Sequence, residues 1–208
     1  MAGETFSQRY LPLVTFERAD VAADYGQIAW ESGLRVLEVG FRTTAAQQAV
    51  TQLRSTTQLI VVAGTLTSTE AIDMAIESGA HWGIAPNFDA DALDYAARRN
   101  FTLVPGIATP TELGAAVKSG HSEVKVYPVS QLGGVHYLST LRAVFPAVGL
   151  IPSGGISLED VALYLSAPGV TAVSGSWLPS VQAHTTDFDA EGLARIVGEL
   201  TEATTGDH

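Results

Sequence analysis

Hydrophobic and polar positions along this chain follow a repeating order, in which a short apolar run precedes a longer segment with helical spacing. We interpret the short apolar runs as β-strands, because they are brief and bounded by glycine, proline or polar residues. They lie at 10–16, 36–41, 59–65, 82–86, 102–107, 123–128, 150–152 and 171–173. The pattern thus predicts eight strands separated by helices.

The segments between these runs carry the apolar spacing of amphipathic helices. They lie at 21–31, 44–53, 68–79, 89–99, 109–120, 135–144, 158–165 and 189–202. Two of the helix starts are explicit in the sequence. Ser68 is a typical N-cap residue, and Thr109 followed by Pro110 and Glu112 predicts a capping box with proline at the first helical position.

Alternating strands and helices predict an α/β fold with parallel strands, either as a closed barrel or as an open doubly wound sheet. Eight units in 208 residues favour closure, since a compact (β/α)8 TIM barrel is about 200 to 250 residues long. No linker or change in composition divides the chain. We therefore predict a single barrel domain over residues 1–208.

Charge and composition limit the classes of partner. The formal net charge of −11 repels nucleic acid and anionic membrane surfaces, so we expect neither as a partner. No run reaches the roughly 18 apolar residues of a membrane span, and the N-terminus lacks the pattern of a secretory signal, which predicts a cytoplasmic protein. Without cysteine, thiolate and disulfide chemistry are excluded.

The histidines give no sign of a metal site, because they lack the paired spacing of metal ligands. They are His81, His121, His136, His184 and His208. We also find no Walker loop, no dinucleotide-binding glycine pattern after the first strand and no GxSxG elbow. The sequence accordingly predicts neither a metal nor a cofactor.

Lysine is rare in this chain, and one of its two lysines, Lys125, lies between Val124 and Val126 within a predicted strand. Because a strand alternates its faces, valines packed against outer helices direct Lys125 into the barrel. Burial there disfavours the ammonium form and favours the neutral amine, which can attack a carbonyl. The alternative is a buried lysine that pairs with a carboxylate for structure alone. Lys118, the other lysine, lies in the last turn of a predicted helix, where a cation interacts favourably with the helix dipole. This position explains Lys118 without a role in chemistry.

The same alternation of faces predicts where Glu38 and Arg42 point in and after the second strand. Glu38 shares a face with Val36 and Gly40, so it also points into the barrel and could form an acid–base pair with Lys125. An internal salt bridge is the alternative. Arg42 falls at the mouth of the barrel, where a guanidinium can bind a carboxylate or phosphate, although a surface ion pair would explain it equally well.

Further candidates lie at the carboxyl ends of other strands, where reactive groups of such barrels are found. Thr65 ends the third strand and Pro86 the fourth, although both fit ordinary loops. Glycine-rich turns at 153–155 and 174–176 follow the last two strands, where such barrels hold phosphate on backbone N–H groups. We therefore hypothesise that these two turns bind the phosphate of a phosphorylated ligand.

Seven short motifs in this order resemble one known family. They are Val36-Leu37-Glu38-Val39 with Arg42-Thr43, Ala63-Gly64-Thr65, Ala85-Pro86, Val104-Pro105-Gly106, Val124-Lys125-Val126-Tyr127-Pro128, Ser153-Gly154-Gly155-Ile156 and Gly175-Ser176-Trp177-Leu178. The chain resembles the 2-keto-3-deoxy-6-phosphogluconate (KDPG) and 4-hydroxy-2-oxoglutarate (KHG) aldolases, class I lyases on trimeric (β/α)8 barrels. It departs from the family pattern at Asn87, Ser174 and 129–131.

The resemblance implies Schiff-base chemistry without a cofactor. Lys125 forms an imine with the keto group of a 2-keto acid, and Glu38 transfers protons. By similarity, Arg42 and Thr65 hold the carboxylate of the keto acid, and Pro86 shapes the pyruvate pocket. A homotrimer is also implied.

For the remainder of the site, the resemblance implies that Tyr127 packs over the imine, in a position where the family usually has phenylalanine. Gly154, Gly155 and Ser176 bind the phosphate. Ser153 keeps a hydroxyl that can donate to the C4 oxygen, which favours gluconate over galactonate stereochemistry.

The resemblance thus implies cleavage of KDPG to pyruvate and glyceraldehyde 3-phosphate. Three alternatives remain: unphosphorylated KHG as the substrate, a 6-phosphogalactonate-type substrate, or a phosphosugar-binding barrel that is not an aldolase.

Overall fold

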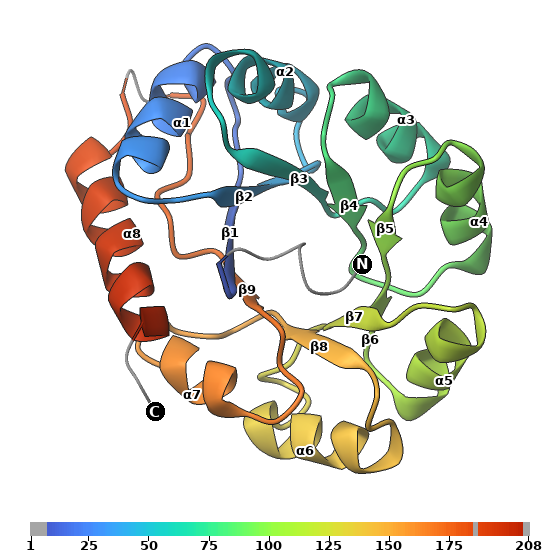
Figure 1. Ribbon diagram of the computed structural model, residues 1–208. Helices are drawn as coiled ribbons and strands as arrows, with labels where there is room; N and C mark the ends of the chain where they lie inside the picture. The colour runs from blue at the N-terminus through green and yellow to red at the C-terminus, as the bar shows by residue number, and fades with distance from the viewer. Residues whose placement is uncertain (1–7, 185–186, 206–208) are drawn as a thin grey trace.

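The computed structural model describes residues 8–184 and 187–205, so both ends of the predicted 1–208 domain, with His208, lie outside the described residues. Figure 1 shows a ring of helices around a closed set of strands. The strands are β1 (Tyr10–Val14), β2 (Val36–Gly40), β3 (Ile60–Gly64), β4 (Trp82–Ile84), β5 (Leu103–Val104), β6 (Gly106–Ile107), β7 (Glu123–Val126), β8 (Gly149–Pro152) and β9 (Val173–Gly175). The helices are α1 (Ala22–Glu31), α2 (Ala46–Thr56), α3 (Thr69–Glu77), α4 (Ala90–Arg98), α5 (Pro110–Lys118), α6 (Gly134–Val144), α7 (Val161–Ser166) and α8 (Ala190–Thr205). The predicted (β/α)8 barrel is confirmed.

The strands pair in parallel throughout, in the order β5-β4-β3-β2-β1-β9 and β6-β7-β8. The two sheets join between β8 and β9, where Leu150 bridges to Val170 and Ser153 to Ser174. At the other join, the carbonyl of Pro105 accepts a hydrogen bond from the Lys125 N–H at 2.8 Å. These links close the barrel and bring the carboxyl ends of its strands to one rim.

Several boundaries differ from the sequence prediction by a few residues; the last strand, predicted at 171–173, is β9 at Val173–Gly175. Two of the differences have a clear physical reason. The continuous strand predicted at 102–107 was wrong, since β5 and β6 are separated by Pro105, which has no N–H to give to a sheet. Helix α7 begins at Val161 rather than at 158. The preceding turn explains the delay, because the Ser157 hydroxyl donates to the Asp160 carboxylate at 2.8 Å and accepts the Asp160 N–H at 3.3 Å.

Side chains alternate between two apolar layers. Leu37 and Val39 of β2, like Val124 and Val126 of β7, belong to the core that packs the strands against the helices. A smaller cluster fills the barrel itself and consists of Leu11, Val36, Val62, Trp82, Ile84, Val104 and Ile151. Polar residues that alternate with the outward set therefore point into an otherwise apolar interior.

The predicted helix caps are present. Ser68 accepts the Ala71 N–H at 3.2 Å, and Thr109 forms the full capping box with Glu112. Both caps satisfy N–H groups that a first helical turn leaves without partners. They fix the points at which the chain turns from a strand into α3 and α5.

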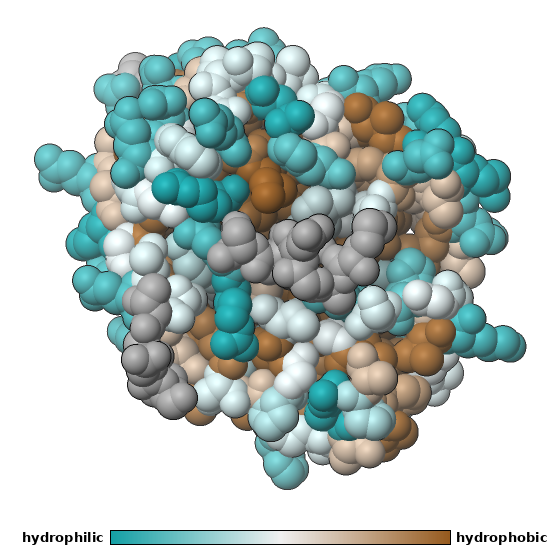
Figure 2. Space-filling view, in the orientation of Figure 1, coloured by the Kyte–Doolittle hydropathy of each residue, from teal (hydrophilic) through white to brown (hydrophobic). Residues whose placement is uncertain are grey.

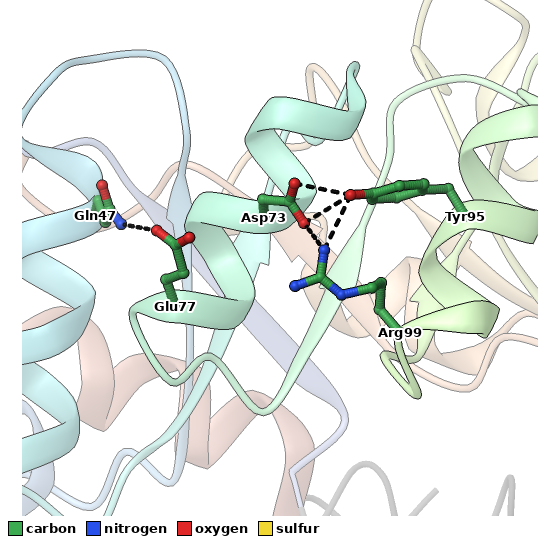
Figure 3. A network of polar contacts seen from close by, with 5 residues as sticks. All are labelled: Gln47, Asp73, Glu77, Tyr95 and Arg99. Atoms are coloured by element: carbon green, nitrogen blue, oxygen red, sulfur yellow. Dashed lines mark hydrogen bonds and ion pairs between the residues drawn. The ribbon is translucent and has the colours of Figure 1, made fainter.

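Polar contacts also tie neighbouring outer helices together (Figure 3). Tyr95 of α4 donates to the Asp73 carboxylate of α3 at 2.8 and 3.0 Å, and Arg99 pairs with the same carboxylate. The Arg99 side chain is 41% exposed, so solvent screening keeps the contribution of this ion pair to stability small. Gln47 of α2 donates to Glu77 of α3 at 3.2 Å.

The outer surface is mainly polar. Figure 2 shows hydrophilic side chains over most of the periphery, with hydrophobic residues in separate areas between them. Among the residues that the structure describes, the exposed large hydrophobic ones are Met74, Val117, Tyr127, Val144 and Leu163. Among the described helices, none combines the length and the apolar character needed to cross a bilayer.

Candidate active site

A buried amine and a buried carboxylate meet inside the barrel. Lys125 of β7 and Glu38 of β2 are 5% and 0% exposed, and the Lys125 Nζ lies 3.2 Å from Glu38 Oε1. Each residue alternates with side chains of the outer core, which is why both point inward. The predicted interior pair is therefore present, at hydrogen-bonding distance.

The second oxygen of Glu38 also has a donor. Ser174 of β9 is fully buried, and its Oγ donates to Glu38 Oε2 at 2.9 Å. Ser153, at the end of β8, lies 3.4 Å from the Ser174 Oγ. Ser174 was predicted to belong to the turn at 174–176 and to depart from the family pattern, whereas the structure places it on β9. The alternation of Ser174 with the outward Val173 was the signal that would have directed it into the barrel.

Arg42 and Thr65 lie together at the mouth, beyond the carboxyl ends of the adjacent strands β2 and β3. The Arg42 Nε donates to the Thr65 Oγ1 at 3.0 Å. Thr65 has φ +62°, a left-handed conformation that is unusual for a β-branched residue. Backbone conformations of this kind are concentrated at binding and catalytic sites. Arg42 is exposed, so its remaining N–H groups face solvent or a ligand.

Tyr127 and Gly154 contact each other at the ends of β7 and β8. A Cβ on Gly154 would lie 2.9 Å from the Tyr127 ring, and Gly154 has φ +94°, so both space and backbone conformation favour glycine. Tyr127 is 38% exposed, so part of its side chain is accessible. The neighbouring Gly155 also has a positive φ, of +76°.

The remaining predicted residues, Pro86 and Ser176, lie after strands on the same rim. Pro86 follows β4, and its backbone packs closely against Gly106 of β6. Ser176 follows β9 directly and is exposed. All the predicted site residues thus come from the carboxyl ends of strands or from the interior, where a (β/α)8 barrel carries its chemistry.

Groups that could hold a metal are absent from residues 8–184 and 187–205, since no three His, Cys, Asp or Glu side chains lie close enough together. What the arrangement offers is acid–base and nucleophilic chemistry. A buried amine beside a carboxylate can attack a carbonyl and exchange protons with the product.

Comparison with known proteins identifies the family. The model of the KDPG and KHG aldolase family matches residues 5–195. The chain belongs to the KDPG and KHG aldolase family. It is accordingly an aldolase, a lyase.

Relatives of the chain carry the same family name. It is 34% identical over 176 residues to a 2-dehydro-3-deoxy-phosphogluconate aldolase of Treponema pallidum, covering 84% of both chains. The KDPG aldolase of Zymomonas mobilis, solved with 3-phosphoglycerate, is 27% identical, with a TM-score of 0.86 and coverage of 95% of this chain and 91% of that one.

A further solved relative bears on the chemistry of the KDPG and KHG aldolases. The KDPG aldolase of Legionella pneumophila was solved with pyruvate captured as a covalent carbinolamine intermediate. It is 25% identical to this chain, with a TM-score of 0.84 and coverage of 95% of this chain and 94% of that one. A carbinolamine requires an amine nucleophile, which is what Lys125 offers inside this barrel.

Proposed function

We propose that this protein is a class I aldolase that cleaves KDPG into pyruvate and glyceraldehyde 3-phosphate. The observation that carries the proposal is the buried Lys125 Nζ, 3.2 Å from the Glu38 carboxylate. Support comes from relatives of about 30% identity that are named 2-dehydro-3-deoxy-phosphogluconate aldolases, and from the carbinolamine in the Legionella relative.

The reaction begins with the Lys125 amine in its neutral form. Its lone pair attacks the C2 carbonyl carbon of the keto acid while the C=O π pair moves onto the oxygen, and a proton then passes from the nitrogen to that oxygen, which gives a neutral carbinolamine. Glu38, in its acid form, donates a proton to the C2 hydroxyl, which leaves as water, and the nitrogen lone pair forms the C=N bond of a protonated imine. Glu38 emerges from this step as a carboxylate beside the imine.

The carbon–carbon bond then breaks. The Glu38 carboxylate takes the proton of the C4 hydroxyl, and the O–H electron pair becomes the C=O bond of the released aldehyde. The electrons of the C3–C4 bond form a C2=C3 double bond, while the C=N pair moves onto the nitrogen and neutralises it. The product on Lys125 is an enamine of pyruvate.

Pyruvate is released by reversing the first steps. Glu38 returns its proton to C3 of the enamine, which restores a protonated imine with a methyl group. Water then adds to C2 and the amine leaves, so that pyruvate and free Lys125 are regenerated. One carboxylate serves each step because it alternates between acid and base.

The groups at the mouth are assigned to substrate binding. Arg42 presents a guanidinium that can hold the keto-acid carboxylate through two hydrogen bonds, and Thr65, 3.0 Å from it, adds a hydroxyl. Tyr127 provides an aromatic wall over the imine, and Pro86 shapes the pyruvate pocket.

We assign binding of the phosphate end of the substrate to the turns after β8 and β9. Gly154 and Gly155 both have positive φ, and such turns direct backbone N–H groups toward an anion. Ser176 adds an exposed hydroxyl, and Ser153 donates to the C4 oxygen. A chain with net charge −11 attracts anions only through such local donors.

Unphosphorylated KHG is a second candidate substrate, because the family model that matches this chain covers both KDPG and KHG aldolases. The same imine chemistry serves both compounds. We favour KDPG because the names of the relatives specify the phosphogluconate.

A homotrimer in the cytoplasm is part of the proposal. Sedimentation equilibrium would measure the number of subunits in the assembly.

Reductive trapping tests the proposal directly. Borohydride added with pyruvate should attach one reduced pyruvyl group at Lys125, located by peptide mass spectrometry. The chain offers a matched control, since Lys118 is its only other lysine. Lys125→Ala should abolish labelling and KDPG cleavage, whereas Lys118→Ala should retain both; an unlabelled wild-type protein would reject imine chemistry.

A further inference from the structure

Ser174 is a fully buried polar side chain with a single strong partner. It lies on β9, next to β1, and donates its hydroxyl proton to Glu38 Oε2 at 2.9 Å. Its neighbour Val173 packs into the outer core, so alternation along β9 turns Ser174 toward the barrel interior.

With this contact, each oxygen of the Glu38 carboxylate has its own hydrogen-bond donor. Oε1 faces the Lys125 Nζ at 3.2 Å, and Oε2 accepts from Ser174. In an apolar interior, a carboxylate oxygen that lacks a donor costs free energy, and a hydroxyl bonded to an ionised carboxylate forms a strong hydrogen bond. Two donors from different strands, β7 and β9, therefore hold the carboxylate plane in one orientation.

Ser153 does not compete for this hydrogen bond. Its Oγ lies 3.4 Å from the Ser174 Oγ, longer than an ordinary O–H···O bond. A serine hydroxyl has one proton: Ser174 directs its own to Glu38, and Ser153 points its proton at the Ser174 Oγ through this long contact. Of these two serines, Ser174 is therefore the one that donates to Glu38.

We propose that Ser174 is a positioning residue, whose hydroxyl fixes the Glu38 carboxylate for proton transfer to and from the Lys125-bound intermediate. The inference rests on the proposed function, because it assumes the imine on Lys125. It adds a residue that acts through Glu38 and touches no reacting atom.

Deuterium exchange into pyruvate tests the role of Ser174 in proton transfer alone, because pyruvate lacks the phosphorylated part of the substrate. In D₂O, Glu38 removes a proton from the methyl group of the pyruvate imine to give the enamine, and deuterium is returned to the same carbon. Ser174→Ala leaves Oε2 without its donor, so we expect exchange to slow by about 10- to 100-fold, the worth of one hydrogen bond to a charged group. The same fall should appear in kcat for KDPG, with KM little changed.

Matched variants separate positioning from packing. Ser174→Gly removes the hydroxyl without adding volume and should slow exchange as Ser174→Ala does. Ser174→Thr retains the hydroxyl and should restore exchange toward the wild-type rate. Ser78→Ala is the control, because Ser78 is also buried but donates to the Ala75 carbonyl in α3, and exchange should be unaffected.

The outcomes distinguish the inference from the proposed function. Wild-type protein that exchanges deuterium, beside Ala and Gly variants of Ser174 that exchange equally fast, would overturn the positioning role alone. Lower melting temperatures of these variants, with an unchanged exchange rate per folded molecule, would also overturn it, because the Ser174 hydroxyl would then contribute to stability alone. Wild-type protein that neither exchanges nor forms the borohydride adduct would overturn the proposed function, and the role of Ser174 with it.

Discussion

Gly64 of β3 lies directly against the side chain of Glu38 on the neighbouring strand β2. A Cβ on Gly64 would be 2.2 Å from Glu38 Oε1 and 2.7 Å from its Cγ. The two strands pair in register at Gly40 and Gly64, and the Glu38 side chain extends along them toward the carboxyl end. The absence of a side chain at Gly64 thus makes the space that the carboxylate occupies.

Gly64→Ala should displace this carboxylate from Lys125. We expect the free energy of unfolding to fall by about 1–3 kcal/mol, as for added volume in a packed core, and KDPG cleavage to fall with it. Urea unfolding and a coupled pyruvate assay would measure both. Gly198→Ala is the control: a Cβ there meets no atom within 4 Å, so this α8 variant should gain about 0.5–1 kcal/mol and keep its activity. Wild-type activity in Gly64→Ala would contradict the contact.

Glu38→Gln should keep the shape of the side chain but remove its ability to accept and return protons. We expect kcat to fall by about 10²- to 10⁴-fold, the range for loss of a general acid–base, while the fold persists. Steady-state kinetics and circular dichroism would report the two effects. Glu77→Gln, at an exposed carboxylate of α3, should leave kcat unchanged. Full activity in Glu38→Gln would exclude the proton-transfer role.

Ser176→Ala tests whether the turn after β9 binds phosphate. Loss of one hydrogen bond to a charged group should lower kcat/KM for KDPG by about 10-fold, and should not affect the unphosphorylated KHG. Ser139→Ala, which removes an exposed hydroxyl bonded within α6, should alter neither value. Equal losses for both substrates would remove the phosphate contact from the proposed site.

His81 makes stability depend on pH. Burial lowers the pKa of His81, and the nearby Arg54 charge lowers it further. The neutral ring accepts the Val61 N–H at Nδ1, at 2.9 Å. Because the unfolded chain binds the proton more readily, the contribution of His81 is complete above the unfolded pKa of about 6.5 and is lost as pH falls toward the folded pKa.

The measurement compares wild type with His81→Gln by urea unfolding at about pH 7.5 and pH 5.5. The wild-type protein should lose more free energy of unfolding on acidification than the variant. The pKa of His121 is also lowered by burial, so the variant should retain part of the slope. Identical slopes would show that His81 is not responsible.

The repeating order of strands and helices could be predicted because it depends on local periodicity. Ser68 and Thr109 marked helix starts for the same reason, since a cap bonds to N–H groups within three residues. The division of 102–107 into β5 and β6 could have been predicted from Pro105 but was not. The inward direction of Glu38 and Lys125 followed from strand alternation alone.

The meeting of these side chains could not be derived from either strand by itself. Glu38 and Lys125 are 87 positions apart, and Ser174 and Glu38 are 136 apart. By itself, the sequence determined the order of strands and helices and the inward direction of Glu38 and Lys125, because those are properties of neighbours in the chain. Only the tertiary structure decided that Lys125 and Ser174 both bond to the Glu38 carboxylate, because barrel closure and strand register set the distances between elements far apart in sequence.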